Sequence, residues 1–113
     1  MSEVTVAQLE AQLEETKVLK NRREQAERLS KNKDFRALII EGFCLHDAAR
    51  FVQLSADPAM DEAARADSLN MAQASGHLKR YLQMQIMMGG TADRNISEIE
   101  LELSELRATE GAE

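Results

Sequence analysis

The first segment of the chain, residues 3–30, carries apolar residues at the spacing of a coiled-coil seam. Val6, Leu9 and Leu13 follow one another three and four residues apart. The positions that continue this seam are polar, so its apolar part extends over about two heptads. Because an isolated helix with so narrow an apolar stripe is marginal in water, we expect this coiled-coil arm to pair with another helix.

A second helix is predicted to follow a polar break at residues 30–34 and to run from Phe35 to Leu54. Its apolar stripe alternates spacings of three and four residues and consists of Phe35, Leu38, Gly42, Leu45, Ala49 and Val52. Further apolar residues widen this stripe, namely Ile39, Phe43, Ala48 and Phe51. A face of that width is typical of a helix buried in a globular core, so this helix is the expected centre of the fold.

A third helix is predicted over residues 58–88, because Asp57 can cap it and Pro58 suits its first position. Its apolar positions are Met60, Ala64, Met71, Ala74, Leu78, Tyr81, Leu82 and Ile86. The short turn before it predicts an antiparallel helical hairpin over residues 35–88. The Gly-Gly pair at 89–90 then either ends the helix at a left-handed cap or forms a hinge.

The last predicted helix, residues 91–108, has a second narrow seam on an otherwise acidic surface. The apolar seam positions are Ile96, Ile99, Leu103 and Leu106. The whole pattern predicts a single all-α domain, residues 1–113, in which a central antiparallel hairpin carries a coiled-coil helix at each end. It leaves open whether the terminal helices pair within one chain or between chains, and it leaves open the oligomeric state.

Composition makes the expected core thin. Of 113 residues, four are aromatic, and large aromatic side chains supply much of the buried area of small domains. Three of these four lie on the second predicted helix and neither coiled-coil arm has one. The arms must therefore bury their apolar residues elsewhere, which indicates a subunit that is completed in an assembly.

Other sequence features bear on the compartment. A lone Cys44 cannot form an internal disulfide, which favours a reducing, intracellular site. No apolar run approaches the roughly 18–20 residues needed to span a bilayer. The first residues are acidic and periodic, unlike a secretory signal. We therefore expect neither membrane insertion nor secretion.

Charge is distributed unevenly along a chain whose net charge is −6. Residues 17–36 carry eight bases and three acids, between two acidic segments. The bases that could contact nucleic acid are Lys17, Lys20, Arg22, Arg23, Arg28, Lys31 and Lys33. A solvated helix face, or pairing of these bases with the acidic ends of the same chain, is the favoured interpretation, because net acidity opposes the approach of phosphates.

No catalytic, metal-binding or cofactor-binding set is evident. Cys44 and His46 are two residues apart and point to different sides of a helix, and no further ligands complete a zinc site with them or with His77. The sequence therefore favours a protein that is not an enzyme and needs no cofactor. The unusual feature is a methionine cluster, Met84, Met87 and Met88. Methionines at helical spacing more often fill a core, but the cluster is also a candidate partner-binding face because methionine adapts to irregular surfaces.

Several runs resemble small helical proteins encoded by tailed bacteriophages among head and packaging genes and described as coil-containing. The runs are KNKDFRALIIEGF at 31–43, DAARFV at 47–52, DP at 57–58, RADSL at 65–69, GHLKRYL at 76–82 and MMGGTADRNISEIE at 87–100. The resemblance covers residues 31–107 and leaves out the N-terminal arm. It implies a virion or host-cytoplasm location during head assembly and transfers no catalytic residue.

These observations support three hypotheses. The first is a non-enzymatic virion structural or head-assembly protein that binds other virion proteins and itself through its helices. The second is a DNA-packaging accessory, similar to a small terminase oligomer, whose basic segment 17–36 contacts phosphates. The third is a regulator that binds a host protein through its methionine cluster.

Overall fold

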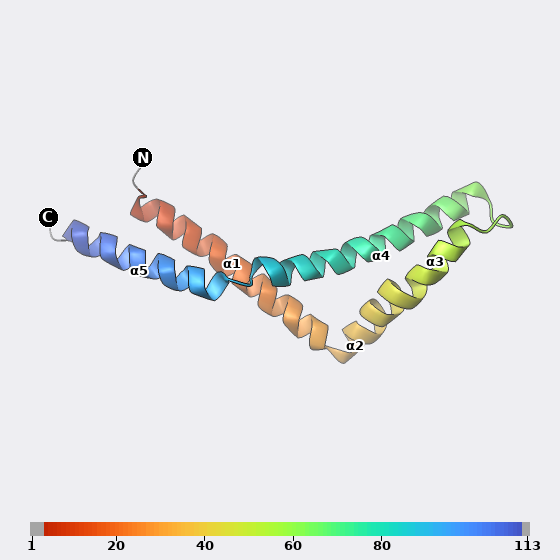
Figure 1. Ribbon diagram of the computed structural model, residues 1–113, viewed down its shortest axis with the longest axis horizontal. Coiled ribbons are helices and arrows are strands. Elements are labelled where there is room, and N and C mark those ends of the chain that lie inside the picture. The colour runs from red at the N-terminus through yellow and green to blue at the C-terminus, as the bar shows by residue number, and fades with distance from the viewer. Residues whose placement is uncertain (1–3, 112–113) are drawn as a thin grey trace. The chain divides into compact units, whose positions relative to one another are not determined.

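A computed structural model describes residues 4–111, and this part of the chain is all-α, with no β-strand. Its elements are α1 (Val6–Lys31), α2 (Lys33–Phe35), η1 (Arg36–Asp47), α3 (Ala48–Ser55), α4 (Glu62–Met88) and α5 (Ala92–Gly111) (Figure 1). Among these helices, none is long and apolar enough to cross a membrane. Two compact units are distinguished: unit 1 takes in the described residues up to Gln25 and from Gln85 onward, and unit 2 is Ala26–Met84.

The start of α1 is set by a reciprocal capping arrangement. The Gln8 backbone N–H donates to Thr5 Oγ1 at 3.1 Å, and the Thr5 backbone N–H donates to Gln8 Oε1 at 2.9 Å. Such a capping box satisfies two backbone donors that a helix start leaves without partners. The helix therefore begins at Val6, whereas the predicted arm began at residue 3, which lies outside the described residues.

Unit 1 pairs α1 with α5 of the same chain. Lys20 Nζ lies 2.7 Å from an Asp93 carboxylate oxygen, and Arg107 Nη2 lies 2.8 Å from Glu10 Oε1. Because the earlier residue of α1 contacts the later residue of α5, the two helices run antiparallel, and Figure 1 shows them side by side. The question that the sequence left open is thus answered in this structure: the terminal helices pair within one chain.

The turn between α4 and α5 packs tightly onto α1. A Cβ atom at Gly89 would lie 2.5 Å from the Cβ of Arg23 and 2.8 Å from the carbonyl oxygen of Leu19. No glycine of the described chain has a positive φ, so the left-handed cap that the sequence suggested here is wrong. Glycine is required at position 89 because the backbone of the turn approaches α1 closely.

Unit 2 contains a long helix built from α2, η1 and α3, which follow one another without a break from Lys33 to Ser55. Asn32 caps its start, since its Oδ1 accepts the backbone N–H of Phe35 at 2.9 Å. Its middle part, η1, is a 12-residue π-helix. A π-helix closes each turn with i→i+5 hydrogen bonds, so side chains four to five residues apart share a face there.

The π-helix corrects the predicted apolar stripe of this helix. Leu38, Leu45 and Val52, which the sequence assigned to the core, are 72%, 60% and 55% exposed. The half-buried face includes Ile39 and Phe43, which the sequence analysis had placed in the widened part of the predicted face. The prediction was wrong because it assumed about 3.6 residues per turn throughout, whereas the wider turn of η1 rotates later residues away from the face shared by earlier ones.

The start of α4 also differs from the sequence expectation. Asp57 Oδ1 accepts the backbone N–H of Ala59 at 2.9 Å in a local turn, and Asp61 Oδ1 accepts that of Ala64 at 2.7 Å. Asp61 is therefore the cap, and the helix begins at Glu62 and not at residue 58. The carboxylate of Asp57 serves the turn and does not reach a helix start.

The inner face of α4 in unit 2 is lined by small residues. Ser68 and Ser75 are buried, and their hydroxyls donate to backbone carbonyls one turn earlier, at 3.0 and 2.7 Å. The Cys44 thiol of η1 donates to the Ser75 carbonyl oxygen at 3.5 Å, which places η1 beside α4. Met71 and Tyr81, which the sequence analysis listed among the apolar positions of this helix, are 38% and 53% exposed.

Candidate interaction surfaces

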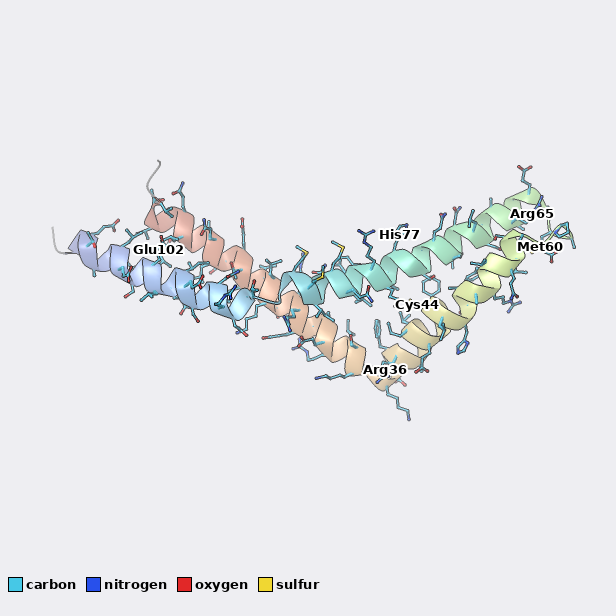
Figure 2. All side chains as sticks on the ribbon, in the orientation of Figure 1. Arg36, Cys44, Met60, Arg65, His77 and Glu102 are labelled. Carbon is cyan, nitrogen blue, oxygen red and sulfur yellow. The ribbon has the colours of Figure 1, made fainter. Side chains whose placement is uncertain are left out.

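Cys44 and His77, whose side chains are the candidates for catalysis or metal binding, do not form a reactive site. Cys44 points from η1 toward α4, and His77 points away from η1 on the exposed side of α4 (Figure 2). Within residues 4–111, no group of three or more His, Cys, Asp or Glu side chains is placed to hold a metal ion. The arrangement of Cys44 is that of a small packed residue.

The seven residues predicted to form coiled-coil interfaces all lie in unit 1. Leu9 and Leu103 are buried. The other five are half-buried: Val6, Leu13, Ile96, Ile99 and Leu106. Because these residues are used where α1 and α5 lie side by side, they are not free to bind another subunit unless this pair of helices separates.

The seam of α1 continues through the polar residues that the sequence analysis placed at its later positions. Lys20 and Arg23 occupy seam positions and are half-buried. The hydrogen bond from Lys20 to Asp93, and the negative charge of Asp93, raise the pKa of Lys20 above its ordinary value of 10.5. Arg23 lies against Gly89 and Gly90. Two of the predicted nucleic-acid contacts are therefore engaged within unit 1, Lys20 in a surface ion pair and Arg23 against the turn between α4 and α5.

The remaining bases of the predicted set are exposed. Lys17 lies 4.0 Å from Glu14 on the same helix, and Arg22 and Arg28 are on the surface of α1. Lys31 and Lys33 join Arg36, Ala37 and Glu41 around an open groove of about 320 Å³, which we call the basic groove. Figure 2 labels Arg36, the first residue of η1, which directly follows α2.

Arg36 is the member of this groove that the sequence analysis did not select. It belonged to the basic segment 17–36, but its position next to Lys31 and Lys33 depends on the break at Asn32. The sequence feature that could have identified Arg36 is the capping residue Asn32, which lies between two runs of bases. It marks a change of helix, and a change of helix brings side chains from both sides of the break together.

The outer side of α5 is acidic. Glu98, Leu101, Glu102 and Glu105 are three or four residues apart or adjacent, so they share one side of the helix, and we call them the acidic face. Leu101 is 62% exposed within it. Glu98 lies 3.9 Å from Arg94, and Figure 2 labels Glu102 on α5.

The methionine cluster is exposed. Met84, Met87 and Met88 are 41%, 78% and 51% exposed, and Tyr81 on the same helix is 53% exposed. The spacing of Tyr81, Met84 and Met88 places them on one side of α4. The sequence left open whether these methionines fill a core or form a partner-binding face, and the structure leaves them exposed.

Unit 2 has little fully buried apolar surface. Among its described residues, Ala26 is the one buried hydrophobic residue, whereas eight large hydrophobic residues are exposed. These eight are Leu29, Leu38, Leu45, Val52, Leu69, Met71, Tyr81 and Met84. Comparisons with protein-family models, with curated proteins and with solved structures find no match to the chain.

Proposed function

We propose that this chain is a non-enzymatic assembly protein that self-associates through its exposed apolar helix faces, as a structural or head-assembly component of a tailed bacteriophage. The observation that carries the proposal is the exposure of eight large hydrophobic residues in unit 2 against one buried hydrophobic residue among its described residues. The resemblance of residues 31–107 to small helical phage proteins supports the phage context.

The physical argument concerns the apolar surface of unit 2. Scattered exposed hydrophobic residues are normal on a monomer, but unit 2 exposes eight large ones, and three of them, Leu38, Leu45 and Val52, lie on one long helix. Each fully buried side chain of this size contributes about 1.5–3 kcal/mol. A chain that leaves them exposed forgoes that stabilisation unless another molecule covers them.

Sedimentation of the purified chain over a range of concentrations tests self-association. We expect the average mass to rise with concentration, and the double variant Leu45→Glu plus Val52→Glu to shift the rise to higher concentration. Gln53→Glu is the matched control, because Gln53 is exposed on the same helix and lacks an apolar side chain. A wild-type chain that stays monomeric at every concentration would overturn the proposal.

The phage context has a separate test. Mass spectrometry of purified particles and of assembly intermediates should detect the chain in one or both. If the chain self-associates but is absent from particles and from every assembly intermediate, the structural role in the virion is wrong, while the interpretation of the apolar faces stands.

A further inference from the structure

The basic groove is a cluster of positive charges without acidic partners from neighbouring helices. Lys31, Lys33 and Arg36 line it, and their side chains form no ion pair with any residue that the structure describes. Glu41 lines the groove as well, which leaves an excess of positive charge. Unpaired cations held close together attract an anionic ligand more strongly than isolated ones do.

The acidic face of α5 has the opposite charge. Glu102 and Glu105 form no ion pair within residues 4–111, and Glu98 has a long contact of 3.9 Å with Arg94. The three carboxylates surround Leu101, which is 62% exposed. An exposed leucine bordered by charges is the arrangement of a small binding patch, in which the apolar residue is buried and the charges fix the register.

The two surfaces complement each other in apolar contact as well as in charge. Ala37 is the apolar residue that lines the basic groove. Docking of the acidic face would bring Leu101 against this residue while three carboxylates meet three cations. Each exposed ion pair contributes little alone, so the apolar contact is needed for binding and the charges select the partner.

We propose that the basic groove of one copy of this chain binds the acidic face of α5 of a second copy. The inference rests on the self-association proposed above and names one of its interfaces. In a two-fold dimer the contact occurs twice, and in a ring or filament it repeats from copy to copy.

Nucleic acid is the competing occupant of a basic groove, and the observations favour the second copy. The chain has a net charge of −6, which repels a polyphosphate at long range. Glu41 inside the groove adds a local repulsion. Lys20, another base of the predicted nucleic-acid set, is paired with Asp93.

Two charge-reversal variants test the proposal by complementation. The groove variant carries Lys31→Glu, Lys33→Glu and Arg36→Glu, and the helix variant carries Glu98→Lys, Glu102→Lys and Glu105→Lys. The matched control, Arg50→Glu with Lys79→Glu and Arg80→Glu, makes the same change of charge at exposed sites outside the groove. Circular dichroism establishes that each variant keeps its helix content.

Sedimentation at low salt supplies the readout. We expect each of the two variants to associate about tenfold more weakly than the wild type, which is the combined effect of three exposed ion pairs. An equimolar mixture of the groove and helix variants should recover association, because the reversed groove then faces a reversed helix. The control should associate like the wild type, and high salt should weaken wild-type association.

The contrary outcomes separate the two proposals. If the wild type associates and the two variants associate equally well, or if the mixture recovers nothing, this interface is wrong and self-association stands. If the wild type is monomeric at every concentration, both proposals fail. If the wild type retards duplex DNA at low salt and the groove variant alone loses that binding while its self-association is unchanged, nucleic acid is the ligand of the groove and the interface is wrong.

Discussion

Gly89 is the residue at which the packing of unit 1 leaves the least space. A methyl group there would lie 2.5 Å from the Cβ of Arg23 and 2.8 Å from the carbonyl oxygen of Leu19. We expect Gly89→Ala to lower the free energy of unfolding by about 1–3 kcal/mol, because either the turn or α1 must move. Urea denaturation followed by circular dichroism measures this change.

Gly76 provides the matched control for that substitution. A Cβ at Gly76 meets nothing within 4 Å, and the residue lies within the helix α4. We expect Gly76→Ala to stabilise the chain by about 0.5–1 kcal/mol, because alanine loses less backbone entropy in a helix. Equal effects of the two substitutions would contradict the close approach of the turn to α1.

Lys20 makes the stability of unit 1 dependent on alkaline pH. Its hydrogen bond to Asp93 and the charge of that carboxylate raise the pKa of Lys20 above 10.5. The stabilisation is therefore complete below about pH 10.5, the ordinary value of the unfolded chain, and is lost as the pH rises through the higher pKa of the folded chain. Asp93→Asn should lower the pKa of Lys20 in an NMR titration of its side chain. An unchanged pKa would show that the ion pair does not form in solution.

At the scale of the element, the helix from Lys33 to Ser55 has two possible assignments of its buried face, and substitutions at single positions distinguish them. The face predicted from a period of 3.6 contains both Leu45 and Phe43, whereas the π-helical structure half-buries Phe43 and leaves Leu45 60% exposed. We expect Phe43→Ala to cost about 1–3 kcal/mol, part of the cost of truncating a fully buried phenylalanine, and Leu45→Ala to cost less than about 0.5 kcal/mol.

The comparison requires a concentration low enough for the chain to be monomeric, since Leu45 is also a proposed contact between copies. Thermal or urea denaturation of the two variants then ranks the two positions. The reverse order, with Leu45→Ala the more costly substitution, would show that the helix is α-helical in solution and buries the stripe that its sequence predicts.

The elements also show what a sequence pattern can predict and what it cannot. Spacings of three and four residues identified every long helix of the described chain, because amphipathic periodicity is a local property. The π-helix was missed because the prediction assumed a constant 3.6 residues per turn. A local change to i→i+5 hydrogen bonds cannot be recognised under that assumption. The start of α4 was misplaced because Asp57 and Asp61 are both suitable caps, and the choice between them depends on the turn that precedes the helix.

At the scale of the whole molecule, candidate surfaces were harder to predict than helices. Local spacing left open whether the methionine cluster is buried or exposed, and the bases of segment 17–36 lie in different surroundings in the structure. Lys20 faces Asp93, which is 73 residues later in the sequence. Lys31 and Arg36 share a groove because a helix break separates them. Both arrangements depend on contacts that no local pattern contains.

Self-association should couple the stability of the chain to its concentration. An assembly that binds the folded chain and not the unfolded one adds about 2.7 kcal/mol of stability when the concentration is about 100 times the Kd. For a domain of roughly 100 residues, such a gain raises Tm by about 10 °C or more. We therefore expect the Tm of the wild type to rise steadily with concentration in calorimetric scans.

The double variant Leu45→Glu plus Val52→Glu isolates the cause of that rise. Both positions are exposed in the single chain, at 60% and 55%, so the substitutions should change the Tm of the dilute monomer little. They should, however, reduce the dependence of Tm on concentration, because charged residues on the contact faces oppose docking. A wild-type Tm that is independent of concentration would mean that these faces stay exposed in solution and that the chain does not self-associate through them.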